Sequence, residues 1–368
     1  MCALAVQVND WRLDDARAYL QSLPKTRHST AADSVDSSMD VNRYDLVIVV
    51  RTTNRDRPLT NTDDYKQPRY NPGYLTQTVA RLLQIFHSDN TAKFHRKKLL
   101  ICSVDPQPQA FTELLQLSDF VQTISRYQTA QQRSDTVTEN KLEKQKDDYA
   151  YCLQAASQFL SPYYMVLEDD VLVDKNAVET VNFVMNYFDL FSAEDWSFLK
   201  LYYPKKWSGY GRSWQTATEL GGYSVLGGCF SSGVMLLLRR CRMRLLNCRN
   251  LWARLWFASG AVCTALLCVS IGRQYVESWR EYLVSTHQLV KAPGCCTPAV
   301  LYPAGVISNL STHLRHVHSD NQSAADIAID GFARTHGFKR YLIHPNIAEH
   351  IGFLSTVRRT STNVEHYL

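Results

Sequence analysis

The segment YYMVLEDDVLVD, residues 163–174, places three consecutive acids inside an apolar run. The run before the acids has the length and composition of a short buried β-strand. Adjacent carboxylates repel one another, and burying them without compensation is costly. Two interpretations remain open: an acidic turn between two strands, or a divalent-cation site. Hard oxygen ligands of this kind suit Mn²⁺ or Mg²⁺, which favours a site built from Glu168, Asp169 and Asp170.

Strand-like and helix-like segments alternate around this stretch. Three further segments have the composition of buried or short strands: DLVIVVRTT (45–53), KLLICSVD (98–105) and FVQTIS (120–125). Apolar residues recur at helical spacing over 74–86 and 143–160. This alternation predicts an α/β fold with a largely parallel sheet. Ligands gather at the carboxyl ends of the strands in such sheets, where the acids fall.

Two long uncharged segments interrupt the α/β pattern. They cover residues 220–238 and 255–272. As helices they would each be roughly 27–28 Å long, close to the ~30 Å hydrocarbon core of a bilayer. We therefore expect a transmembrane hairpin inserted into one globular domain, with a soluble helical hairpin as the alternative.

The positive charge of the chain is concentrated between these segments. Residues 239–254 contain six arginines and no acid, so the net charge of +5 becomes about −1 for the rest of the chain. The positive-inside rule places this loop in the cytoplasm and both flanking halves on the opposite, luminal side. The charge therefore indicates topology, and we expect no nucleic-acid partner.

No strand is followed by a phosphate-binding loop, a GxGxxG fingerprint or a GxSxG elbow. The sequence thus offers no support for a nucleotide hydrolase, a dinucleotide dehydrogenase or a serine hydrolase.

Several motifs together resemble one known family. The acidic triplet is similar to the D-x-D-type motif of GT-A glycosyltransferases. An ordered set of segments resembles the post-GPI-attachment-to-proteins factor 4 family, whose GT-A domain is also interrupted by a tandem transmembrane hairpin. The segments are EKQKDDYAYCLQ (143–154), YYMVLEDDVLV (163–173), FLKLYYPKKW (198–207), CCTPAVLYPA (295–304), SAADIAI (323–329) and YLIHPNIAEHIGFLSTVR (341–358).

The resemblance implies a reaction and a place for it. The enzyme would transfer N-acetylgalactosamine (GalNAc) with inversion from UDP-GalNAc to a mannose of the glycan on GPI-anchored proteins. It would reside in the Golgi membrane, with its catalytic domain in the lumen. The expected fold is a Rossmann-like GT-A domain, residues 44–217 and 274–368, interrupted by the hairpin at 218–273. Residues 1–43 would form an N-terminal helix and linker. Family members normally carry a further N-terminal anchor, whereas the apolar start of this chain is too short to span a membrane.

The expected site combines residues from distant segments. Asp170 and His350 would bind Mn²⁺ or Mg²⁺, although His350 also suits a core position. Glu168, Asp169, Arg51, Thr52 and Lys200 would contact the donor, with plain strand-end polar residues as the alternative for Arg51 and Thr52. Asp326 is the candidate for the base that takes the acceptor proton, in competition with Asp330 and with a helix-capping role.

Two other functions and the cysteine pairing remain open at this stage. The chain could be another UDP-sugar transferase, of the GlcNAc type, acting on N-glycans or glycolipids. It could also be a non-catalytic membrane-bound protein that keeps the GT-A-like fold.

Cys295 and Cys296 are adjacent, which disfavours pairing with each other, and Cys102 or Cys152 are candidate partners for either.

Overall fold

A computed structural model of the 368-residue chain describes residues 3–24, 43–55, 71–88, 94–127, 140–190, 195–204, 209–210, 214–241, 249–283, 286–317 and 324–352. The chain divides into two compact units. The first comprises Met1–Tyr203 and Gln288–Leu368, and the second comprises Pro204–His287. Of the predicted N-terminal helix and linker at 1–43, residues 25–42 lie outside the described residues, as does the centre of the arginine-rich loop, residues 242–248.

An eight-stranded mixed sheet forms the centre of the first unit. The strand order is β3-β2-β1-β4-β8-β6-β9-β7. Strands β1 to β4 run parallel, β8 runs antiparallel to β4 and β6, and β7 runs antiparallel to β9. The strands are β1 (Leu46–Thr52), β2 (Lys97–Ser103), β3 (Gln122–Ser125), β4 (Tyr163–Glu168), β6 (Trp196–Lys200), β7 (Gln288–Lys291), β8 (Ala299–Pro303) and β9 (Lys339–His344). A separate antiparallel pair joins β5 (Val171–Val173) to β10 (Ala348–His350).

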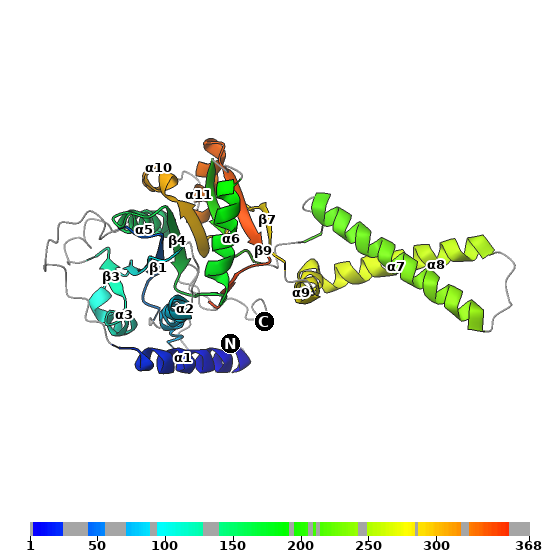
Figure 1. Cartoon of the computed structure of the whole chain (residues 1–368), viewed down its shortest axis with the longest axis horizontal. Coiled ribbons are helices and arrows are strands. Elements are labelled where there is room, and N and C mark those ends of the chain that lie inside the picture. Colours follow the sequence, from blue (N-terminus) through cyan, green and yellow to red (C-terminus); the bar gives the residue numbers. More distant parts are fainter. Residues whose placement is uncertain are drawn as a thin grey trace. The chain divides into compact units, whose positions relative to one another are not determined.

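Helices cover both faces of this sheet (Figure 1). Alternate residues of β1 point to opposite sides, so Ile48 enters one apolar cluster and Val49 the other. The cluster around Ile48 includes residues of α1 (Ala3–Ser22), α2 (Tyr74–Ser88), α3 (Thr112–Leu117) and α6 (Ala177–Leu190). The cluster around Val49 includes residues of α5 (Lys141–Ala156), α10 (Ala304–His316) and α11 (Ala325–Thr335). A short 3₁₀ helix, η1 (Pro108–Ala110), precedes α3. The predicted α/β class is confirmed, and each strand predicted above is present within a few residues.

The second unit contains the predicted helical hairpin. Helix α7 (Trp214–Cys241) and helix α8 (Arg249–Ile271) pack against each other and cross in the view of Figure 1. Their apolar parts, Thr216–Leu238 and Leu251–Ile271, are 23 and 21 residues long. Only 11% and 6% of an 18-residue apolar window in each is buried. A core helix of a soluble protein would be mostly buried, so this exposure favours two membrane-spanning helices and a membrane protein.

Small residues explain how the two helices pack so closely. A Cβ atom on Gly227 would overlap the side chain of Thr264, and one on Gly260 would overlap that of Ser231. Small residues at such positions let transmembrane helices approach one another. The glycines in the first apolar segment are therefore consistent with a span.

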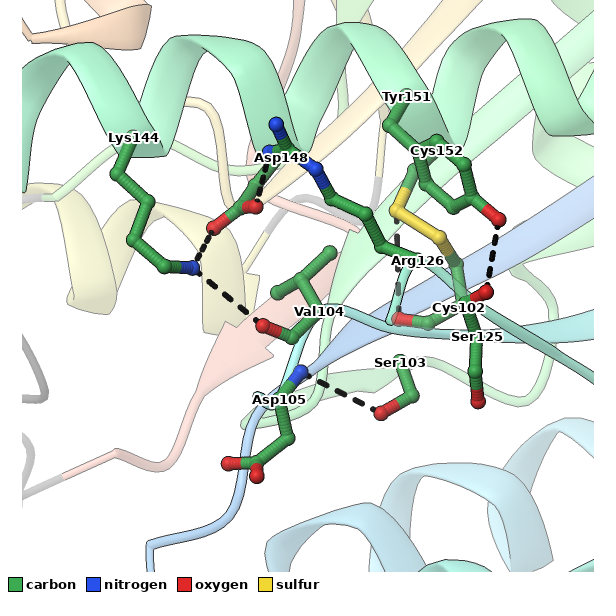
Figure 2. Close-up of a disulfide and its surroundings, with 10 residues drawn as sticks. All are labelled: Cys102, Ser103, Val104, Asp105, Ser125, Arg126, Lys144, Asp148, Tyr151 and Cys152. Carbon is green, nitrogen blue, oxygen red and sulfur yellow. Dashed lines mark hydrogen bonds and ion pairs between the residues drawn. A yellow bond between two sulfur atoms is a disulfide. The ribbon is translucent and has the colours of Figure 1, made fainter. Parts of the chain in front are cut away.

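The cysteine pairing differs from the one considered above, in which Cys295 or Cys296 would bond to Cys102 or Cys152. The described residues contain a disulfide between Cys102, on β2, and Cys152, on α5 (Figure 2). Cys295 and Cys296 are free, with their sulfur atoms 3.3 Å apart. The sequence could not show this because β2 and α5 become neighbours only when the sheet forms.

Removing this disulfide should destabilise the first unit. The bond closes a loop between residues 50 positions apart. Chain-entropy arguments give such a loop about 4 kcal/mol of stabilisation. We expect the Cys102→Ala/Cys152→Ala variant to unfold at clearly lower denaturant concentration, measured by near-ultraviolet circular dichroism. Cys295→Ala is the control and should unfold like the original protein. Identical unfolding of the double variant would show that the bond adds no stability.

Candidate metal and donor site

The acidic triplet lies where β4 ends and β5 begins. Parallel pairing sets Arg51 of β1 opposite Glu168 of β4. The Thr78 hydroxyl on α2 donates to the backbone carbonyls of Asp169 and Val171, which fixes the turn against that helix. Asp169 and Asp170 are both 3% exposed. The turn is thus a buried, rigid part of the sheet edge.

His350 reaches this turn through the small second sheet. It pairs with Val171, and the Ile351 N–H donates to the Asp170 carbonyl at 2.8 Å. Its Nε2 atom lies 3.3 Å from Oδ2 of Asp170. One ligand atom each from Glu168, Asp170 and His350 lie within 4.8 Å of one another. The structure therefore brings His350 next to Asp170, 180 positions away in the sequence, and next to Glu168. Their binding of a metal ion stays a prediction.

Two arginines compensate part of the negative charge. Arg51 lies 2.5 Å from Glu168 and rests on the ring of Tyr149. Arg55 bridges both aspartates: it forms an ion pair with Asp169 and lies 2.9 Å from Oδ2 of Asp170. With the His350 imidazole neutral, as a metal ligand must be, three carboxylates against two guanidinium groups leave one negative charge in the buried turn.

The three carboxylates have different surroundings. Asp169 accepts from the Thr52 hydroxyl at 2.8 Å as well as from Arg55, so both of its oxygens are engaged. Oδ1 of Asp170 is buried and has no hydrogen-bond partner among the described residues. A buried carboxylate oxygen without a partner, on a site of residual negative charge, suits a bound cation. Glu168, Asp170 and His350 offer the oxygen and imidazole ligands that Mn²⁺ accepts, so the site fits such an ion.

The pKa shifts follow these contacts. Burial raises the pKa of Asp169. Burial also opposes ionisation of Asp170, but Arg55 and His350 outweigh it and hold the pKa of Asp170 below its usual value. Asp170 therefore stays ionised more readily than Asp169 and is the better placed of the two to attract a cation.

Lys200 and Asp326 form a second group around the loop that precedes β8. Lys200 is 1% exposed, and its ammonium donates to the carbonyls of Pro293 and Cys295. Asp326, in the first turn of α11, accepts from the Cys296 N–H at 2.9 Å. The same loop reaches the acidic turn, because the Glu168 N–H donates to the Pro298 carbonyl at 2.8 Å. Here Lys200 positions the loop, and its contact with the donor phosphate stays a prediction.

Burial also lowers the pKa of Lys200, to about 8. The pKa of Cys295 is lowered to about 7, chiefly by its hydrogen bond with Cys296. Cys295 in the loop and Lys200, which donates to the loop from the end of β6, therefore titrate near neutral pH beside the candidate base.

Several residues of the site were not predicted from the sequence. Arg55 follows the first strand closely, but nothing in its neighbours signals an ion pair with a turn 114 residues away. Arg126 lies 2.5 Å from Asp148, which also binds Lys144, next to the disulfide (Figure 2). Lys144 and Asp148 lie within the 143–154 segment, one of those that carry the family resemblance. Their place in that segment is the signal that could have singled them out.

Gly352 was also missed, and it limits the space beside the metal ligands. A Cβ atom at this position would overlap the carboxylate of Asp170. We expect Gly352→Ala to displace that carboxylate and to weaken Mn²⁺ binding by roughly 10- to 100-fold, as losses of supporting contacts around metal ligands do. Titration with Mn²⁺, followed by electron paramagnetic resonance, measures the affinity. Gly305→Ala, which meets no atom within 4 Å, is the matched control. Unchanged affinity in Gly352→Ala would contradict the described position of Asp170.

Comparison with known proteins identifies the family. The sequence pattern described as GPI-N-acetylgalactosamine transferase PGAP4 matches residues 46–349, which is most of the chain. The chain belongs to the PGAP4 family. The resemblance inferred from the motifs is thereby confirmed, and the family name makes it a glycosyltransferase family acting on GPI. The match includes the two halves of the sheet and the hairpin between them.

Among solved structures, one similar fold is that of the CMP:2-keto-3-deoxy-manno-octonic acid synthetase complexed with CTP. Its identity to this chain is 9%, and its TM-score is 0.33. The match covers 81% of this chain and 88% of that one. A likeness this distant carries no argument about the site of the PGAP4-family chain.

Proposed function

We propose that this protein transfers GalNAc from UDP-GalNAc to a mannose of the GPI glycan, with inversion. The observation that carries the proposal is the convergence of Glu168, Asp170 and His350 in a chain of the PGAP4 family. The acceptor would be the glycan of GPI-anchored proteins at the luminal face of the Golgi membrane. The arginine-rich hairpin loop would then lie in the cytoplasm.

The chain's own residues suggest how a donor would be held. Glu168, Asp170 and His350 would bind Mn²⁺ or Mg²⁺. When bound, the cation supplies Lewis-acid neutralisation of the charge on the departing nucleoside diphosphate. Thr52 and Arg55 hold Asp169 in place, and Arg51 does the same for Glu168. The acidic turn is therefore organised before the donor arrives, which is the arrangement that favours electrostatic catalysis.

Asp326 would take the proton of the acceptor hydroxyl. Its side chain is only half-buried, whereas Asp330 is 1% exposed and paired with both Arg334 and Arg340. A carboxylate enclosed by two arginines is a poor proton acceptor, so the geometry favours Asp326 over Asp330. Asp326→Asn should lower kcat by roughly 10²- to 10⁴-fold, the usual range for a lost general base. Its KM for the acceptor should stay the same, and normal turnover would exclude the assignment.

A donor comparison tests the reaction itself. The purified full-length protein, in lipid nanodiscs with Mn²⁺, is supplied with UDP-GalNAc or UDP-GlcNAc and a GPI-glycan acceptor. We expect transfer from UDP-GalNAc, its loss on chelation and its return with added Mn²⁺. Transfer from UDP-GlcNAc alone would favour a GlcNAc-type enzyme acting on N-glycans or glycolipids. Failure to bind UDP and Mn²⁺ by calorimetry would favour a non-catalytic protein.

A further inference from the structure

Helix α9 (Arg273–Leu283) follows the second apolar helix without a linker. Helix α8 ends at Ile271, and Gly272 adopts a left-handed conformation with φ +92°. The Gly272 N–H donates to the Cys268 carbonyl and closes α8. A left-handed glycine at this point ends one helix and redirects the chain. Helix α9 therefore begins at the end of the α8 span.

A buried charge network ties α9 to the base of the hairpin. Arg273 lies 2.9 Å from Glu219, on α7, and also pairs with Glu277, on α9 itself. Glu277 is fully buried, and Arg273 and Glu219 are each 14% exposed. These three charged side chains thus face inward, where the arginine pairs with both glutamates.

Two aromatic residues of α9 have the opposite arrangement. Tyr275 is 52% exposed and Trp279, one helical turn later, is 76% exposed. Trp214, at the start of α7, is 86% exposed. A helix in water buries its aromatic face and exposes its charges, so this polarity is reversed. Burying the indole and phenol rings needs an environment that is apolar on one side and wet on the other.

We propose that α9 lies in the interface of the bilayer that the hairpin crosses, with Tyr275 and Trp279 among the lipid headgroups. The continuity with α8 points to lipid as the occupant, because Gly272 alone separates α9 from an apolar span. Trp and Tyr are the residues enriched at this depth of a membrane, and amphipathic helices bind there. The salt-bridged base would hold the helix at the end of the spans. This inference concerns the second unit alone and does not depend on the proposed reaction.

Fluorescence quenching in lipid tests this position. The full-length protein and the Trp279→Phe variant are placed in phosphatidylcholine nanodiscs, with or without bromine near the headgroup end of the acyl chains. The difference between the two proteins gives the signal of Trp279. We expect brominated lipid to reduce that signal by roughly twofold or more, and aqueous iodide to have little effect, as for a tryptophan in the interface.

Two results would overturn the proposal. Quenching by iodide without quenching by brominated lipid would place Trp279 in water. Protection from both quenchers would mean that protein covers it. Tyr275→Trp in the Trp279→Phe background provides a second reporter on the same face, and the proposal requires that brominated lipid quench it too.

Discussion

Asp170→Asn should abolish transfer while leaving the protein folded. The substitution keeps the shape of the side chain beside Gly352 but removes the charge that faces His350 and the oxygen that has no partner among the described residues. A bound metal contributes several kcal/mol to catalysis, and about 4 kcal/mol corresponds to a thousandfold change in rate. We therefore expect kcat/KM to fall at least about 10³-fold and Mn²⁺ binding to become undetectable by paramagnetic resonance.

Glu349→Gln is the matched control for this variant. Glu349 precedes the predicted ligand His350 on the same short strand, but its side chain is 61% exposed. Its ion pair with Arg12 is long, with 4.0 Å between the nearest nitrogen and oxygen atoms. Such exposed ion pairs contribute little, so the control should keep its activity and metal affinity. Full activity of Asp170→Asn would remove the acidic turn from the reaction.

Asp330→Asn should lower the stability of the protein about as much as removing the disulfide does. Asp330 is 1% exposed and pairs with Arg334, on its own helix, and with Arg340, on β9. Neutralising it leaves Arg340, which is 13% exposed, without its buried partner. Breaking a buried pair in this way typically costs about 3–5 kcal/mol. Denaturant unfolding followed by near-ultraviolet circular dichroism measures the loss.

Asp326→Asn is the informative comparison, because it changes the same residue type one turn earlier on α11. Its carboxylate receives the N–H groups of Cys296 and Ile327 near the helix N-terminus, a position worth about 0.3–1 kcal/mol. We expect this variant to be nearly as stable as the original protein but poorly active. A stable Asp330→Asn variant with lost turnover would reverse the assignment and make Asp330 the base.

The part of the fold that follows from local pattern was predictable. The β-branched run of β1, the helical spacing of α2 and the uncharged lengths of α7 and α8 each indicate their own structure. The sheet order depends on contacts between distant segments. The antiparallel insertion of β8 between β4 and β6 has no signal in any single segment.

The site divides in the same way. The sequence indicated Glu168, Asp169 and Asp170 because three acids in an apolar run demand compensation. It did not indicate that two arginines provide most of it. The bridge from Arg55 to both aspartates and the close approach of Gly352 arise only when residues from both ends of the chain meet at the acidic turn. His350 was reached through the family resemblance rather than through any local feature.

The central claim is that this acidic turn serves GalNAc transfer to GPI. Mass spectrometry of GPI glycans from cells lacking the protein tests it most directly, with the original protein or Asp170→Asn then restored. We expect the N-acetylhexosamine branch on mannose to disappear, to return with the original protein and to stay absent with Asp170→Asn. Unchanged glycans in cells lacking the protein, or full restoration by Asp170→Asn, would contradict it.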